Sequence, residues 1–303
     1  MAMQKLRKTI KKALAGAVRK LRRYVQALEE DKDNRARDYS KDDFAYPWLN
    51  SQFESVLREA GAGKKPSYAW GVLHAAHLAS QLGVKAISVL EFGVAGGNGL
   101  VILENVGESV EHIFGLRIDV HGFDTGKGLP KPEDYRDMPN LYLEAAFPMD
   151  VEKLQKRLKR ARLHLGLVRD TATAFIDSRP PPVAFVAIDL DYYSSTMDAF
   201  QILEADRRLL LPRVHCYFDD IMGFTNSEFN GERLAIAEFN QFHEMRKISP
   251  IYGLKYFLPP RYAPGEWVEE MYMAHLFDHP CYGRYDGLVR RPFSGGTDLQ
   301  DER

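Results

Sequence analysis

From residue 87 onward, short apolar runs alternate with longer amphipathic segments. The apolar runs predict strands over residues 87–94, 120–124, 163–168, 183–189 and 215–218. The helical periodicity between them predicts helices over 99–108, 151–160, 195–211 and 232–246. This alternation is typical of a parallel sheet with helices on both faces, so we expect an α/β fold with a doubly wound, mostly parallel sheet. Residues 269–278 predict a late strand, antiparallel and near the edge.

The first 66 residues have a different pattern. Apolar residues recur every three or four positions over residues 4–28, and the same stretch carries Lys and Arg but no acid, which predicts a basic amphipathic helix. A polar connector, a second helix over 48–60 and a glycine-rich break over 61–66 follow. We therefore expect a helical extension over 1–66 and a main domain over 67–303.

The apolar stripe of the basic helix needs a partner surface, because an isolated helix of this length is marginally stable in water. We expect it to pack against a second subunit, which makes the protein a homo-oligomer. Packing on its own domain and peripheral contact with an anionic membrane are the alternatives.

Composition excludes several classes of protein. The chain has 41 Lys and Arg against 42 Asp and Glu, and this balance argues against a general nucleic-acid binder. No apolar run approaches the ~20 residues that span a bilayer. Only Cys216 and Cys281 are present, which excludes a disulfide scaffold and indicates a reducing, cytoplasmic compartment.

Acidic residues mark the end of every predicted parallel strand. They are Glu91, Asp124, Asp170, the pair Asp189 and Asp191, and the pair Asp219 and Asp220. Ligands of such sheets bind at the carboxyl ends of the strands, so we expect these carboxylates to surround one crevice. Clustered carboxylates repel one another unless a cation is bound, which favours a functional site over accidental loop acids.

A glycine-rich loop over 93–99 follows the first strand. Gly93 and Gly97 permit a tight turn and a close approach of the backbone to a ligand. The spacing is not G-x-G-x-x-G, and Glu91 would disfavour a pyrophosphate, so both features argue against a nicotinamide cofactor. Glu91 suits instead a zwitterionic ligand such as the aminocarboxypropyl arm of S-adenosylmethionine.

The next two strand ends fit the rest of the same ligand. Asp124, followed by Thr125, suits a ribose diol, because a carboxylate accepts hydrogen bonds from two hydroxyl groups. Asp170, followed by Thr171, is placed one strand further along for the adenine edge.

Five segments, over 90–94, 123–125, 188–199, 218–220 and 235–239, carry a family resemblance. They resemble the class I S-adenosylmethionine-dependent methyltransferases and, more narrowly, the macrocin O-methyltransferase family of metal-dependent sugar and natural-product O-methyltransferases. The most specific segment is the Asp-x-Asp-x-Tyr-x-Ser-Thr string that begins at Asp189. The segments run in family order over about half of the chain.

The resemblance implies methyl transfer from S-adenosylmethionine to a hydroxyl of a sugar or natural-product acceptor, with a divalent metal. The carboxylates of Asp189, Asp219 and Asp220 are hard oxygen ligands that suit Mg²⁺. By analogy with the family, Asp191 is the base. The Pro- and aromatic-rich segment 131–149 is a candidate lid over the acceptor. The alternatives are a nicotinamide-dependent oxidoreductase and a non-catalytic binding protein with the same fold.

Overall fold

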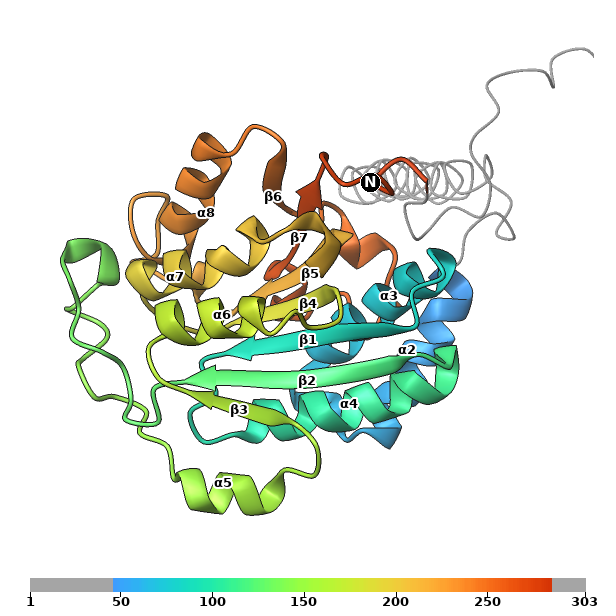
Figure 1. Cartoon of the computed structure of the whole chain (residues 1–303), viewed down its shortest axis with the longest axis horizontal. Helices are drawn as coiled ribbons and strands as arrows, with labels where there is room; N and C mark the ends of the chain where they lie inside the picture. Colours follow the sequence, from blue (N-terminus) through green and yellow to red (C-terminus); the bar gives the residue numbers. More distant parts are fainter. Residues whose placement is uncertain (1–45, 285–303) are drawn as a thin grey trace, which may run out of the picture. The chain divides into compact units, whose positions relative to one another are not determined.

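A seven-stranded sheet runs through the computed structural model, which describes residues 46–284 (Figure 1). The strand order is β3-β2-β1-β4-β5-β7-β6. The parallel strands are β3 (Arg162–Leu165), β2 (Arg117–Asp124), β1 (Ala86–Phe92), β4 (Val183–Ile188) and β5 (Leu210–Phe218). Strand β7 (Met271–Leu276) is antiparallel to both β5 and β6 (Arg246–Pro250). The expected doubly wound, mostly parallel sheet is confirmed.

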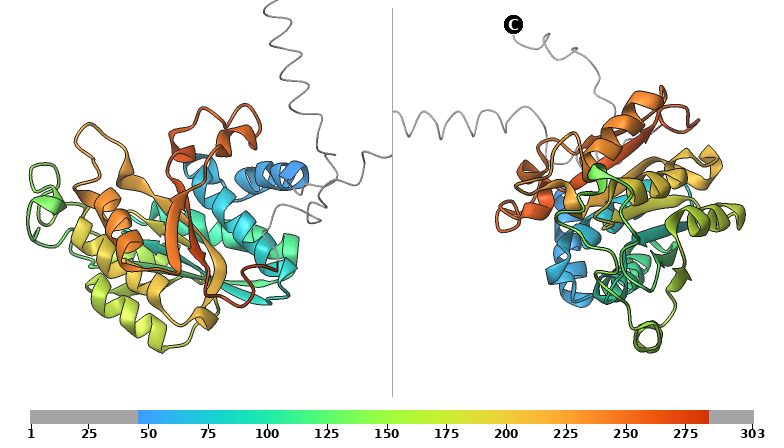
Figure 2. Two further views of the ribbon diagram at one scale, coloured as in Figure 1. Left: turned by 90° about the horizontal axis from the view of Figure 1, so that it is seen from above. Right: turned by 90° about the vertical axis from the view of Figure 1, so that its left-hand side faces the viewer.

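Helices cover both faces of the sheet (Figure 2). One face carries α2 (Tyr46–Glu59), α3 (Pro66–Gln81) and α4 (Asn98–Phe114), and the other carries α6 (Val168–Asp177), α7 (Tyr193–Glu204) and α8 (Gly231–Phe242). The short helix α5 (Val151–Arg157) buries Leu154 in the core of the first face. Strand β4 is apolar throughout because its side chains alternate between the two hydrophobic cores. Phe185 and Ala187 pack on the first face, and Val186 and Ile188 pack on the second.

Several element boundaries differ from the sequence prediction, and one strand was missed. Helix α7 ends at Glu204, and the residues that we expected to continue it start strand β5 at Leu210. Strand β6 was not predicted, because only Ile248 among its five residues is buried and no apolar alternation marks it. Strand β7 is confirmed as antiparallel and near the edge, where it pairs on both sides and lies one place in from the edge strand.

The compact unit includes residues on both sides of the expected boundary at residue 66. Leu49, Phe53 and Val56 of α2 are fully buried in the core that α3 and α4 share. The predicted basic helix over 4–28, with its subunit or membrane contacts, lies outside the described residues. Within residues 46–284, no helix has both the length and the apolar character to cross a bilayer.

Helix α3 directly precedes β1 and packs on the sheet against β4 and β5. It runs back along the sheet, so its first residues lie at the carboxyl ends of the strands. Lys65, immediately before this helix, contacts Asp189 after β4 and Asp219 after β5. A segment that the sequence marks only as a break is therefore part of the edge where the strand-end acids meet.

Candidate active site

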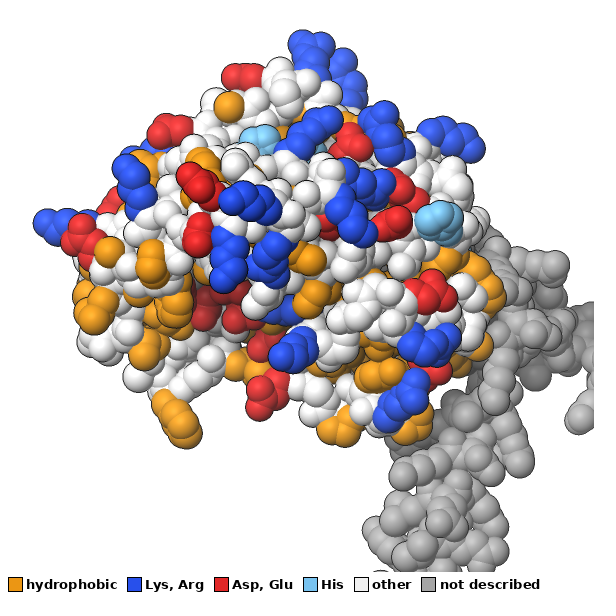
Figure 3. Space-filling view, turned by 90° about the horizontal axis from the view of Figure 1, so that it is seen from below, with side chains coloured by type: hydrophobic (Ala, Val, Ile, Leu, Met, Phe, Trp, Pro, Cys, Tyr) orange, Lys and Arg blue, Asp and Glu red, His pale blue; other side chains and the backbone are white. Residues whose placement is uncertain are grey.

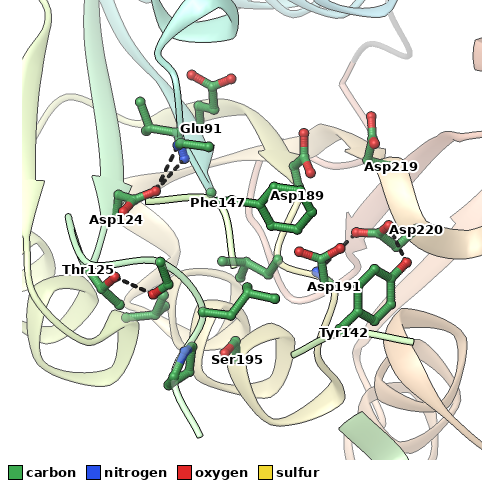
Figure 4. Close-up of a pocket in the computed structure, with 18 of the residues that line it drawn as sticks. Glu91, Asp124, Thr125, Tyr142, Phe147, Asp189, Asp191, Ser195, Asp219 and Asp220 are labelled. Carbon is green, nitrogen blue, oxygen red and sulfur yellow. Dashed lines mark hydrogen bonds between the residues drawn. The ribbon is translucent and has the colours of Figure 1, made fainter. Parts of the chain in front are cut away.

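A cavity of about 530 Å³ opens at the carboxyl ends of the parallel strands (Figure 4). The sequence-predicted residues that line it are Glu91, Gly93, Gly97, Asp124, Thr125, Asp189, Asp191, Asp219 and Asp220. Acids from four separate strand ends thus face one cavity, as the parallel topology predicts.

Two predicted cofactor residues do not line this cavity. Asp170 is exposed in the first turn of α6, and the hydroxyl of Thr171 donates to the carbonyl of Leu167, 3.0 Å away. Strand β3 already ends at Leu165, so the residues that reach the cavity here are 167–169. The assignment of Asp170 and Thr171 to the adenine edge is corrected accordingly.

Glu91 lies buried at one end of the cavity. The hydroxyl of Tyr68 donates to its Oε1 at 2.7 Å, while its buried Oε2 has no partner in the described part of the chain. Burial raises the pKa of Glu91 to about 8. A Cβ at position 99 would come within 1.9 Å of Glu91 Oε1, so Gly99 leaves the space that this carboxylate occupies. A cationic ligand group in the cavity would satisfy the unpartnered oxygen.

Asp124 holds the glycine loop in place. Its Oδ2 accepts hydrogen bonds from the backbone N–H groups of Val94 and Ala95, at 3.0 and 2.8 Å, and its Oδ1 accepts from Gly126 N–H at 2.6 Å. Thr125 donates to the carbonyl of Gly128 at 2.6 Å and closes the next turn. The contact of Asp124 with a ribose stays a prediction, and the structure adds a second role for this residue, that of organising the loop.

We therefore expect Asp124→Ala to weaken binding of S-adenosylhomocysteine about ten- to a hundredfold, the effect of losing charge-assisted hydrogen bonds of ~1.5–3 kcal/mol. Calorimetry on the folded variant measures this loss. Asp170→Ala, at the exposed position off the cavity, is the matched control and should bind as wild type does. An unchanged affinity in Asp124→Ala would contradict both the ribose contact and the organising role.

Lys65 lies between two of the predicted metal ligands. Its Nζ is 3.1 Å from Asp219 Oδ1 and 3.5 Å from Asp189 Oδ2. The hydroxyl of Tyr217 also donates to Asp219 Oδ1. Burial and the charge of Asp219 raise the pKa of Asp189, and Lys65 opposes this shift.

Asp220 and Asp191 form the second half of the acid cluster. Asp220 accepts from the hydroxyl of Tyr142 at 2.9 Å and from the backbone N–H of Asp191 at 3.0 Å. Burial and the neighbouring Asp220 raise the pKa of Asp191. The backbone of Asp191 has φ of +60°, a conformation that costs a non-glycine residue energy and that recurs at functional sites. Buried Glu232 accepts from the backbone N–H of Asp220 at 3.1 Å, and its Oε1 has no partner among residues 46–284.

The predicted lid segment 131–149 is anchored beside the acid cluster. Buried Asp137 accepts from the backbone N–H and the hydroxyl of Ser194, at 2.8 and 3.0 Å, and so supplies a cap to the first turn of α7. Tyr142 reaches Asp220, and Phe147 lines the cavity. The segment therefore lies against the candidate acceptor end of the cavity.

Sequence reasoning missed several residues of the site. Lys65, Tyr68, Tyr142, Tyr217 and Glu232 all contact the acids that it identified. None lies in a motif whose spacing indicates a role. Four of them are close to these acids only in the folded chain. Tyr217 is the exception, because it lies two residues before Asp219 in the sequence, on β5.

Comparison with protein-family models and with curated proteins finds no match. Among solved structures, the chain is similar to the calicheamicin methyltransferase CalS11, at 20% identity over 67% of this chain and 88% of that one, with a TM-score of 0.43. It is similar to the O-methyltransferase NovP at 16% identity over 57% and 70% of the two chains, with a TM-score of 0.44. An O-methyltransferase from Bacillus cereus, in complex with SAH, matches at 15% identity over 74% and 89%, with a TM-score of 0.38.

Of these three solved structures, NovP and the Bacillus cereus protein are named O-methyltransferases, and CalS11 is named a methyltransferase.

Proposed function

We propose that the protein is an S-adenosylmethionine-dependent O-methyltransferase that acts on a hydroxyl of a sugar or natural-product acceptor with the help of a divalent cation. One observation carries the proposal. A single cavity joins a glycine loop and Glu91, one of whose oxygens has no partner in the described residues, at one end to a cluster of four aspartates at the other.

The Glu91 end fits the cofactor. The buried, unpartnered Oε2 of Glu91 supports a cationic ligand group at this end, such as the ammonium of the methionine moiety, and the glycine loop, held by Asp124, lines the same cavity. A pyrophosphate would meet the Glu91 carboxylate here, which disfavours a nicotinamide cofactor. S-adenosylmethionine supplies an electrophilic methyl group, so the protein has to place an oxygen nucleophile in line and remove its proton.

The aspartate end fits a hard dication by the chemistry of its donors. Asp189, Asp219 and Asp220 offer only carboxylate oxygens, and the negative charge of the cluster exceeds the single charge of Lys65. Within residues 46–284, no three such side chains are arranged as a ready-formed metal site, and Lys65 and Tyr142 contact oxygens of Asp219 and Asp220. A bound dication would lower the pKa of the acceptor hydroxyl.

The position of Asp191 supports the role of the base that takes the acceptor proton. Its carboxylate lines the cavity, and the hydrogen bond from its backbone N–H to Asp220 fixes its position next to the cluster. Burial keeps its carboxylate basic, which suits a general base.

The acceptor end of the cavity borders an apolar surface. Leu141, Leu143 and Phe147 of the lid and Phe224 after the acid pair are exposed. Figure 3 shows one face of the molecule, where hydrophobic side chains gather beside a recess that contains acidic ones. An acceptor that combines a hydroxylated ring with an apolar body would match both surfaces, which supports a natural-product glycoside.

Calorimetry with S-adenosylhomocysteine and with NAD tests the cofactor, and transfer of labelled methyl from S-adenosylmethionine to a panel of hydroxylated glycosides tests the reaction. We expect binding of S-adenosylhomocysteine and none of NAD, with label on oxygen. Binding of NAD alone would reject the proposal, and binding of the cofactor without transfer to any acceptor would favour a non-catalytic protein.

We expect Asp219→Asn to raise the Mg²⁺ concentration needed for half-maximal methyl transfer, because a neutral amide is a weaker ligand than a carboxylate. The increase should be about tenfold or more, and turnover at saturating Mg²⁺ should largely recover. Asp206→Asn, at an exposed position remote from the cavity, is the control. Full activity of the wild-type enzyme after removal of metal by a chelator would contradict the role of the dication.

A further inference from the structure

The ammonium group of Lys65 lies in a site built from two carboxylates and two aromatic rings. It contacts Asp189 and Asp219, and it is 5.4 Å from the ring centroids of both Tyr68 and Tyr217. The side chain is 26% exposed, so most of it is covered. Both tyrosine hydroxyls are directed to acids of the cavity, Tyr68 to Glu91 and Tyr217 to Asp219.

The backbone holds Lys65 in this position. Lys65 is the N-cap of α3 and precedes Pro66, which occupies the first turn of the helix. Its N–H donates to the carbonyl of Ala62 at 3.0 Å, and its own carbonyl accepts from Tyr68 N–H at 3.1 Å. The Lys65 backbone is therefore fixed at both ends, so the ammonium can leave its site only by rotation about the bonds of the four-carbon side chain.

We propose that Lys65 is an internal counter-cation that neutralises Asp189 and Asp219 in the metal-free protein and has to leave them before a divalent cation binds. This inference rests on the proposed function, because it assigns those two carboxylates to the metal. The ammonium contacts oxygens of the two carboxylates that a metal would need, and two positive charges a few ångströms apart repel each other.

The arrangement helps four aspartates to stand together in a folded apo protein. Without Lys65, the partly exposed carboxylates of Asp189 and Asp219 would have no cation in direct contact among residues 46–284. The partial exposure of the Lys65 side chain leaves it a route toward solvent when a stronger cation arrives. Because Lys65 and the dication exchange at Asp189 and Asp219, there is a threshold concentration of metal. Below it, Lys65 contacts the two carboxylates.

The first test measures binding of Mn²⁺ to the metal-free full-length protein by calorimetry. Lys65→Met keeps the length of the side chain and removes its charge, so we expect it to bind Mn²⁺ at least about tenfold more tightly than wild type, a change of about 1.4 kcal/mol. Lys64→Met, at the exposed neighbouring position, is the matched control and should bind Mn²⁺ as wild type does. Equal or weaker binding by Lys65→Met, or no binding by either protein, would overturn the inference.

The second test uses the wild-type chain and so does not depend on the folding of a variant. The rate at which acetic anhydride modifies Lys65, followed by peptide mass spectrometry, should rise severalfold when Mn²⁺ is added, because the displaced amine becomes accessible. Lys64 should react at the same rate with and without metal. An unchanged or slower reaction of Lys65 would overturn the inference.

Failure of this inference and failure of the proposed function are distinguishable. Binding of S-adenosylhomocysteine by the wild-type protein, titrated in the same preparation, reports on the cofactor site alone. If the cofactor product binds while Lys65→Met leaves Mn²⁺ affinity unchanged, the role of Lys65 is rejected and the methyltransferase proposal stands.

Discussion

Replacing Asp191 by Asn is expected to lower kcat for methyl transfer by ~10²–10⁴, the usual contribution of a general base. An amide has nearly the shape of the carboxylate but cannot take the acceptor proton. The backbone N–H that bonds Asp220 at 3.0 Å is kept, so the cluster around it should stay in place. Binding of S-adenosylhomocysteine and of Mn²⁺ should therefore change little, which separates loss of the base from loss of a ligand.

The control for this variant is Asp170→Asn, the same chemical change at an exposed position that does not line the cavity. Its kcat should be that of wild type. Single-turnover rates with labelled S-adenosylmethionine measure the chemical step directly. A kcat within about threefold of wild type in Asp191→Asn would remove this residue from the proton transfer.

The pH dependence follows from the same carboxylate. Burial, with Asp220 and Asp189 nearby, raises the pKa of Asp191 above its ordinary range, and the base acts only when deprotonated. The rate should therefore increase with pH through this raised pKa, and added dication should shift the rise to lower pH because positive charge favours the carboxylate. A rate independent of pH between 5 and 9 would contradict the assignment.

The second large effect is expected on stability. Gly93 has φ of +84°, and a Cβ at this position would lie 1.6 Å from the backbone oxygen of Asp189. The backbone cannot move away easily, because Gly93 N–H donates to Phe123 O at 2.9 Å and Asp189 N–H to Phe92 O at 2.9 Å. We expect Gly93→Ala to lower the free energy of unfolding by at least about 3 kcal/mol, from strained φ and steric overlap together.

Gly96→Ala is the matched control in the same loop. A Cβ at Gly96 would have no atom within 4 Å, and its φ is not positive. This variant should stay within about 0.5 kcal/mol of wild type. Urea unfolding followed by circular dichroism measures both variants. Equal midpoints for Gly93→Ala and wild type would contradict the close approach of β1 and β4 at this point.

The fold class could be predicted from the sequence because its signals are local. A continuous apolar run such as that of β4 predicts a strand that is buried on both faces. The acids that follow the parallel strands are predicted to lie together, because parallel strands end at the same edge of a sheet. In β6 only one residue is buried, so its sequence shows no alternation of apolar and polar residues that would predict a strand, and this strand was missed. Asp170 shows the limit at the strand ends, because β3 ends at Leu165 and Asp170 already lies in the first turn of α6, outside the lining of the cavity.

The sequence by itself determined the parallel strands, the glycine loop and most of the carboxylates that meet at the strand ends. Only the tertiary structure decided which other groups meet those carboxylates. Lys65 is separated from Asp189 by 124 residues and from Asp219 by 154, and Tyr142 from Asp220 by 78. No periodicity or motif spans such separations. These contacts arise because α3 runs back along the sheet and the lid folds over its edge, and each depends on the packing of the whole domain.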